Sequence, residues 1–216
     1  ALADHDFMQT FWGQPLEKTW DTVKKKADKY YDPGSFVTLA GYEYSGGGPQ
    51  GGHFNIYYFE DNGEIYPCML YAGDGKGGFH FTENGAYKDI KEVYKKLKNK
   101  KAMVIPHCVY GPENKWTNTD PELSPVAEIY SFWGISESFP NSRPPTPLVK
   151  NFNEEPAATC YQESLKKGLK IGVIGGTDGH DGFPGFSYSW GSYRGGIMGV
   201  FMKELTREAL WDAMWA

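Results

Sequence analysis

Short apolar runs alternate with amphipathic segments along this chain, and this alternation most constrains the fold. Residues 102–106 and 171–174 form strand-length apolar runs, whereas residues 15–32 and 87–101 place apolar side chains on one helical face. Strands that are apolar throughout are typical of a parallel sheet covered by helices. An open doubly wound sheet and a β/α barrel both fit, and in either we expect functional residues at the carboxyl ends of the strands.

Turn and capping residues place the remaining elements. Strands are expected over 35–45, 126–134 and 195–204, and helices over 154–167 and 206–215, the last capped by Thr206. Residues 53–70 are predicted to form a hairpin excursion, because Asp61-Asn62-Gly63 is a hairpin turn signal. No fixed-period repeat divides the 216 residues, so we expect residues 1–216 to form one domain.

Charge and cysteine content narrow the classes of partner. The net charge is −5, and a nucleic-acid-binding domain normally carries a basic excess, so we expect a small-molecule partner and no nucleic acid. The apolar runs fall short of the roughly 20 residues that span a bilayer, so no membrane partner is expected. Cys68, Cys108 and Cys160 are odd in number and lack metal-finger spacing, which argues against a disulfide framework. The compartment stays open between cytoplasm and periplasm.

Both ends of the sequence look like interrupted elements. The opening "ALADHD" passes from apolar to polar residues like the tail of a strand, and the closing "TREALWDAMWA" is a helical pattern without a stop signal. We therefore expect the chain to be an internal piece of a longer protein.

Four of the five histidines and two carboxylates lie at the ends of predicted strands. These six candidate metal ligands are His5, Glu43, His53, His107, Asp178 and His180. Imidazole and carboxylate ligands suit Zn, Mn or Fe, and six of them exceed what one tetrahedral ion takes. The sequence therefore predicts two or three divalent ions, with Glu43 as a bridge. Residues i and i+2 of a strand point the same way, so Asp178 and His180 are expected to face one ion.

Other polar residues are candidates for supporting roles. Asp4 and Asp6 flank the first histidine and would orient it, and Glu128 would hydrogen-bond a ligand histidine. Arg143 and Arg194 are candidates for holding a substrate anion. The two aspartates and the two arginines also have an ordinary explanation as solvated surface groups.

The order of these motifs resembles that of the PHP domain, named for polymerase and histidinol phosphatase. "ADHD" resembles the family's Asp-His motif, "GYEYS" its following Glu, His53 and "IPHC" its single histidines, and "TDGH" its closing Asp-x-His. The wider series of motifs is similar to a bacterial PHP-like branch of unassigned function. The resemblance implies a distorted (β/α)7 TIM-like barrel of the PHP type, incomplete at its N-terminus. It also implies up to three metal ions and hydrolysis, most often of phosphate esters, by a metal-activated water.

One departure and three alternatives accompany this interpretation. The family's opening His-x-His precedes the Asp-His motif at which this sequence begins, so those ligands either lie upstream or are missing from a weaker site. An amidohydrolase acting on C–N or C–O bonds shares the ligand types. In that class, however, the last barrel strand typically provides a single Asp, and a Lys often bridges the metal ions. A non-catalytic binding module would use the aromatic residues, which make up 16% of the chain. A degenerate barrel would hold metal for structure alone.

Overall fold

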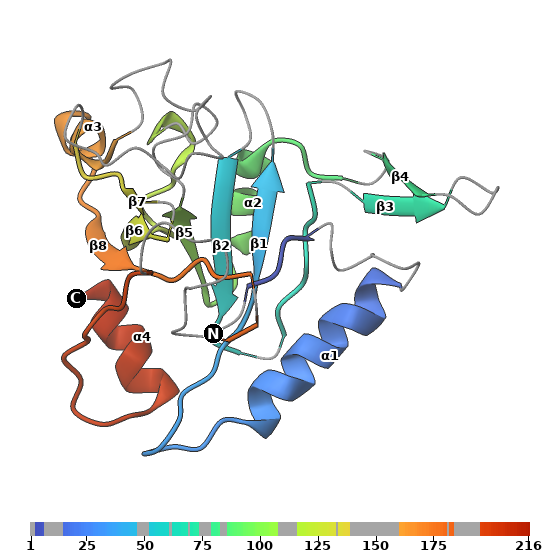
Figure 1. Ribbon diagram of the computed structural model, residues 1–216, viewed down its shortest axis with the longest axis horizontal. Helices are drawn as coiled ribbons and strands as arrows, with labels where there is room; N and C mark the ends of the chain where they lie inside the picture. The colour runs from blue at the N-terminus through green and yellow to red at the C-terminus, as the bar shows by residue number, and fades with distance from the viewer. Residues whose placement is uncertain are drawn as a thin grey trace.

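The computed structural model describes residues 3–6, 15–46, 52–60, 62–68, 70–73, 79–82, 86–107, 116–132, 134–138, 160–180, 182–183 and 195–216. The described strands form three sheets (Figure 1). The first sheet has the order β1-β2-β5 and consists of β1 (Ala40–Gly46), β2 (Gly52–Tyr58) and β5 (Ala102–His107). The second pairs β3 (Leu70–Gly73) with β4 (Phe79–Thr82). The third has the order β7-β6-β8, from β6 (Val126–Ser131), β7 (Gly134–Ile135) and β8 (Gly172–Gly175).

The first sheet has two faces with different tasks, and β2 shows this in its sequence. Phe54, Ile56 and Tyr58 are buried on one face, while His53, Asn55 and Tyr57 alternate with them on the other. The apolar face is covered by helices α1 (Leu16–Lys29) and α2 (Ile90–Leu97), as Figure 1 shows. This packing leaves the second face available for a functional site.

Apolar side chains at helical spacing attach α1 and α2 to the sheet. Trp20 of α1 is buried against the β1 and β2 tyrosines and donates a hydrogen bond from Nε1 to the Gly63 carbonyl oxygen at 2.8 Å. The buried residues of α2 are Ile90, Val93, Tyr94 and Leu97. Asp89 caps α2 by accepting a 2.9 Å hydrogen bond from the Lys91 backbone N–H. Both helices lie within the residue ranges that the sequence predicts.

The second face is apolar at one end, where helix α4 (Arg207–Trp215) packs against it. Trp211 and Met214 of α4 contact Met103 and Ile105 of β5 in a separate apolar cluster. Thr206 caps this helix, as predicted, by accepting a 3.2 Å hydrogen bond from the Ala209 backbone N–H. The opposite end of the same face carries the polar side chains described below.

Two further segments extend the array of strands sideways. The chain at residues 4–5 runs parallel to β1, where the Glu43 N–H donates to the Asp4 carbonyl oxygen at 2.9 Å. On the other side, β6 lies beside β5 and pairs in parallel with β8. Helix α3 (Tyr161–Lys166) precedes β8 and is followed by Gly168, whose φ of 82° suits a helix end. The N-terminal segment, β1, β2, β5, β6 and β8 therefore lie side by side, although they are far apart in the sequence.

The predicted (β/α)7 TIM-like barrel is wrong. The structure has two sheets of three strands and a two-stranded sheet, and its described residues form four α-helices and no closed barrel. The first sheet is antiparallel, because the five residues that link β1 and β2 are too few for a parallel crossover. The apolar runs did not reveal the antiparallel orientation, because both faces of the sheet bury apolar side chains. Helices α1 and α2 cover one face, and α4 covers part of the other.

Two local predictions also differ from the structure. The apolar residues at 195–204 form no strand in the described chain, and Ile197 and Phe201 are exposed. Within residues 53–70, β2 pairs with β1 and β5, whereas residues 63–67 lie in no strand. Within the described part of the chain, no helix combines the length and apolar composition that a membrane span requires.

Candidate metal centre

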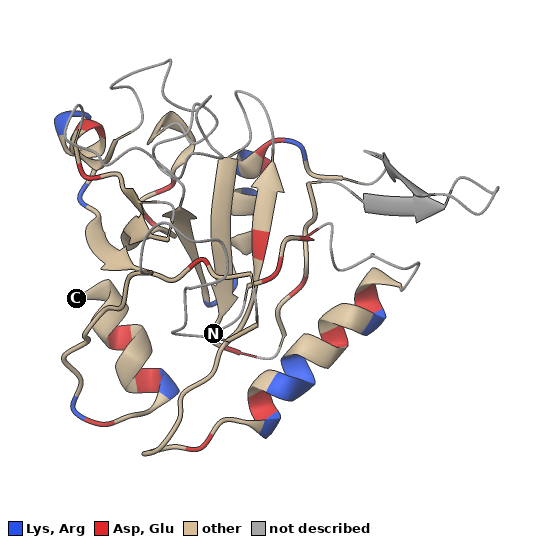
Figure 2. Ribbon diagram, viewed as in Figure 1, with Lys and Arg blue, Asp and Glu red and all other residues tan. Residues whose placement is uncertain are grey.

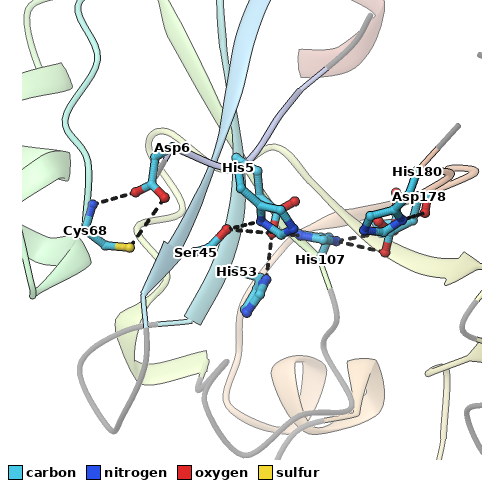
Figure 3. A network of polar contacts seen from close by, with 10 residues as sticks. His5, Asp6, Ser45, His53, Cys68, His107, Asp178 and His180 are labelled. Atoms are coloured by element: carbon cyan, nitrogen blue, oxygen red, sulfur yellow. Dashed lines mark hydrogen bonds and ion pairs between the residues drawn. The ribbon is translucent and has the colours of Figure 1, made fainter. Parts of the chain in front are cut away.

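Adjacent strands each contribute one imidazole or carboxylate to a single site. In spatial order across the array, the contributions are His5 from the N-terminal segment, Glu43 from β1, His53 from β2, His107 from β5, Glu128 from β6 and Asp178 from the turn after β8. Cross-strand register explains part of this placement, because His53 pairs directly with His107. We call these six residues the candidate metal centre (Figure 3).

One carboxylate oxygen of Glu43 lies at the middle of this group. Four polar atoms lie within 3.1 Å of Oε1: Nδ1 of His53 (2.6 Å), Oγ of Ser45 (2.9 Å), Nδ1 of His5 (3.1 Å) and Nε2 of His107 (3.1 Å). A carboxylate oxygen has only about two lone pairs to offer. Three imidazole nitrogens around one carboxylate oxygen are the donor set that a divalent cation requires, so these residues fit a metal ion.

His107 connects the two halves of the centre. Its Nε2 faces Glu43, while its Nδ1 lies 3.8 Å from Glu128 Oε1 and 3.7 Å from Asp178 Oδ2. The imidazole is 3% exposed, so both of its nitrogens face protein groups. A carboxylate behind a ligand histidine fixes the ring and its tautomer. Glu128 therefore lies where the sequence predicts a partner for a ligand histidine.

Asp178 and His180 reach the site by a different route from the one predicted. Strand β8 ends at Gly175, and Asp178 has a φ of 50°, a left-handed conformation that Asp tolerates better than most residues. The two side chains therefore do not share a strand face. His180 Nδ1 lies 3.0 Å from the Asp178 carbonyl oxygen, and its exposed ring lies 6.1 Å from the ring of His5. His180 thus belongs to the rim of the centre.

The charges at the centre shift several pKa values. Burial alone would raise the pKa of Glu43, but the charge of His107 and the hydrogen bonds from the histidines hold it well below its usual range. Burial lowers the pKa of His5, yet the hydrogen bond and charge of Glu43 outweigh this and raise it overall. Burial raises the pKa of Asp178 to about 7, and repulsion from Glu128 adds to the shift that His107 opposes. A divalent cation held here would therefore compete with protons for these groups.

Metal affinity is expected to rise with pH up to about 7 and then to level off. Below that pH a proton must leave Asp178, whose pKa is raised to about 7, and another must leave His5. We expect a gain of up to about tenfold per pH unit for each proton released, and so up to about a hundredfold per unit below pH 7, measured by titration calorimetry with Mn²⁺ or Zn²⁺.

The matched variants for this pH profile are Asp178→Asn and Asp21→Asn. Asparagine tolerates the backbone conformation at 178 but does not titrate, so its profile should be shallower, at lower affinity. Asp21 lies on α1, 57% exposed in a salt bridge with Lys24, and its variant should follow the wild type. Parallel profiles for Asp178→Asn and wild type would exclude Asp178 from the metal centre.

Gly176 gives the Glu128 carboxylate its space. A Cβ at position 176 would lie 2.0 Å from Glu128 Oε2, so Gly176→Ala must move that carboxylate away from His107. Because this group is the end of a flexible side chain, stability should change little. Metal affinity should fall about 10- to 100-fold, which calorimetry would measure.

Two further variants make the Gly176 prediction specific. In a Glu128→Ala background, adding Gly176→Ala should lower affinity no further, because the displaced carboxylate is already gone. Gly199→Ala, where a Cβ meets open space, should bind metal like the wild type. An undiminished loss in the Glu128→Ala background would show that Gly176 does not act through Glu128.

The remaining predicted site residues have mixed outcomes. Asp4 contacts β1 through its carbonyl oxygen and is exposed. Asp6 is fully buried, and its carboxylate accepts a 2.5 Å hydrogen bond from the Cys68 N–H and lies 3.5 Å from the Cys68 Sγ (Figure 3), while its role in orienting His5 stays a prediction. Arg143 and Arg194 lie outside the described residues.

Sequence reasoning missed three neutral polar residues on the same face. Ser45 donates to Glu43 and lies 2.5 Å from His5 Nδ1, while Asn55 and Tyr57 follow His53 along the site face of β2. The signal was available, because residues two apart on a strand share a face. Once Glu43 and His53 are candidates, their i+2 neighbours become candidates as well.

Comparisons with known proteins identify similar chains without assigning an activity. The profile of a family described as "Protein of unknown function (DUF3604)" matches residues 3–108. An uncharacterized protein of Chlamydia pneumoniae is 28% identical over 203 residues, which cover 91% of this chain. The matched region spans only 30% of that relative's length. No solved structure matches. The first half of this chain, which carries His5, Glu43, His53 and His107, is thus similar to that family of unknown function.

Proposed function

We propose that this protein is a metal-dependent hydrolase that cleaves phosphate esters at a centre of two or three divalent ions. The observation that carries the proposal is the convergence of three imidazole nitrogens on one oxygen of Glu43. The order of its motifs, similar to that of the PHP family, supports the same reaction class. The substrate would be a small phosphorylated molecule.

The residues divide the work according to their positions. Glu43, central and ionised, would bridge ions that His5, His53, His107 and Asp178 hold. Bound ions supply an activated water and neutralise charge on the phosphoryl oxygens.

Three further residues support these ligands. Glu128 lies on the Nδ1 side of His107 and would keep its ring in place. Ser45 donates to Glu43 and thereby orients the central carboxylate. His180, exposed at the rim, is positioned to meet the substrate or a further ion.

The residues around the centre support an amidohydrolase function less well. Enzymes of that kind often bridge their metals with a lysine, and strands β1, β2, β5, β6 and β8 contain none. The part of the site that the structure describes is built from imidazoles, carboxylates and a hydroxyl.

The proposal is tested by elemental analysis and a substrate panel on the same purified protein. We expect at least one bound Mn, Zn or Fe per chain, and hydrolysis of phosphomonoesters or phosphodiesters that chelation abolishes and metal restores. Hydrolysis of amides or carboxylic esters alone would favour the amidohydrolase class. Purified protein that binds none of these three metals would overturn the proposal.

A further inference from the structure

A polar cavity of about 160 Å³ adjoins the candidate metal centre. It is lined by Ala3, Asp4, Glu43, Asn55, Tyr57, Glu128, Gly176, Thr177, Asp178, Gly179 and Phe183. Its volume is below the range of about 300–1,000 Å³ that is typical of pockets for drug-sized ligands. The cavity therefore suits one small chemical group placed next to the metal centre.

We propose that this cavity binds an uncharged, hydroxyl-rich group of the substrate, such as a sugar, a cyclitol or glycerol, and that Asn55 and Tyr57 select it. The inference rests on the proposed function only for the phosphate, which the metal centre would take. The polyol selection itself rests on the lining of the cavity.

The charges of the lining argue against a second anionic group. Four carboxylic acids line the cavity: Asp4, Glu43, Glu128 and Asp178. None of the described residues that line it is Lys or Arg, and strands β1 and β2 contain neither (Figure 2). Bound ions would offset the charge of Glu43 and Asp178, but Asp4 and Glu128 would still repel a nucleic acid or polyphosphate that entered the cavity.

The neutral polar side chains of the lining, Asn55 and Tyr57, can form further hydrogen bonds. Asn55 lies opposite Glu43 and Tyr57 opposite Gly41, where a Cβ would meet the Tyr57 ring at 2.3 Å. Within the described part of the chain, neither the Asn55 amide nor the Tyr57 hydroxyl hydrogen-bonds another residue. The Tyr57 phenol and the Asn55 amide can each donate and accept hydrogen bonds.

Donors and acceptors together distinguish a polyol from a cation. Carboxylates accept hydrogen bonds, and both hydroxyl and ammonium groups can supply them. The Asn55 amide and the Tyr57 phenol also donate, and an ammonium group has no lone pair to accept. A hydroxyl group both donates and accepts, so it satisfies the two kinds of residue at once. The exposed ring of Phe183 adds an apolar surface to the lining, suited to the C–H face of a sugar ring.

The test combines ligand binding with substrate selectivity in Asn55→Leu and Tyr57→Phe. Binding of glucose, myo-inositol and glycerol would be followed by saturation-transfer NMR, which needs no turnover. Hydrolysis would be compared between the monophosphates of these three compounds and p-nitrophenyl phosphate. Tyr30→Phe and Asn99→Leu, at exposed positions, serve as matched controls.

We expect at least one of the three polyols to bind wild-type protein and to lose binding in both site variants. For its monophosphate, each site variant should lower kcat/KM about five- to tenfold, mainly through KM, as loss of one hydrogen bond predicts. Activity on p-nitrophenyl phosphate, which carries no polyol, should fall clearly less than activity on that monophosphate, and both controls should match the wild type on both substrates.

The outcomes separate this inference from the proposed function. Polyol binding that the site variants lose, in a protein that hydrolyses no phosphate ester, would refute the proposed function and support the cavity's assignment. Phosphatase activity without polyol binding, or with equal losses on both kinds of substrate, would overturn the assignment and leave the proposed function standing.

Discussion

Replacing Glu43 with glutamine is expected to lower phosphate-ester hydrolysis by about 10³-fold or more and to remove at least about half of the bound metal. The substitution keeps the volume of the side chain and removes the charge on which three histidines converge. An amide cannot bridge two cations as a carboxylate does, and its NH₂ group would face imidazole nitrogens. Metal content would be measured by mass spectrometry and turnover with the best substrate of the panel.

Glu64→Gln is the matched control for this prediction. Glu64 is exposed and interacts with Tyr66 and Lys100, so its variant should keep wild-type metal content and activity. A thermal melt would show that Glu43→Gln remains folded, because a loss of fold would also remove metal. A folded Glu43→Gln protein with unchanged metal content would place the metal elsewhere and refute the centre described here.

The positions of the candidate ligands could be predicted better than the fold that carries them. His5, Glu43, His53 and His107 stand in or beside apolar runs, which marks them as candidates whatever the pairing of the strands. His53 opens β2, as the sequence predicts, and so it enters the site from the amino end of an antiparallel strand. Convergence depended on cross-strand register, which local sequence does not determine.

Strand direction was the part of the fold that the sequence could not supply. Apolar residues on both faces were attributed to a parallel sheet, yet β1, β2 and β5 are antiparallel. The second face of these strands is covered by α4 at one end and carries the candidate metal centre at the other. The strand expected at 195–204 is absent, because apolar composition alone predicted it, whereas apolar side chains there, such as Ile197, lie on the surface.

Alanine in place of Gly196 is expected to destabilise the protein by about 2–3 kcal/mol, and thus to lower its Tm by roughly 4–12 °C. A Cβ there would lie 2.8 Å from the Tyr130 carbonyl oxygen, 2.9 Å from the Gly175 Cα and 3.0 Å from the Gly176 nitrogen. These are backbone atoms of β6, β8 and the residue after it, so a rotamer change cannot relieve the contact. The Gly196 N–H also donates to the Gly176 carbonyl oxygen at 2.7 Å, and the added methyl would strain that bond.

This packing also links Gly196 to the metal centre. Gly176 lies two residues before Asp178, so a displaced backbone at 176 carries the Asp178 carboxylate away from His107, which it approaches at 3.7 Å. Gly196→Ala should therefore lose both metal affinity and stability, whereas Gly176→Ala, in which only a side chain moves, should lose metal affinity alone. Gly199→Ala, whose Cβ meets open space, should lose neither. Denaturant unfolding and metal titration of the three variants would measure the difference, and a wild-type Tm for Gly196→Ala would contradict the close approach of these backbone segments.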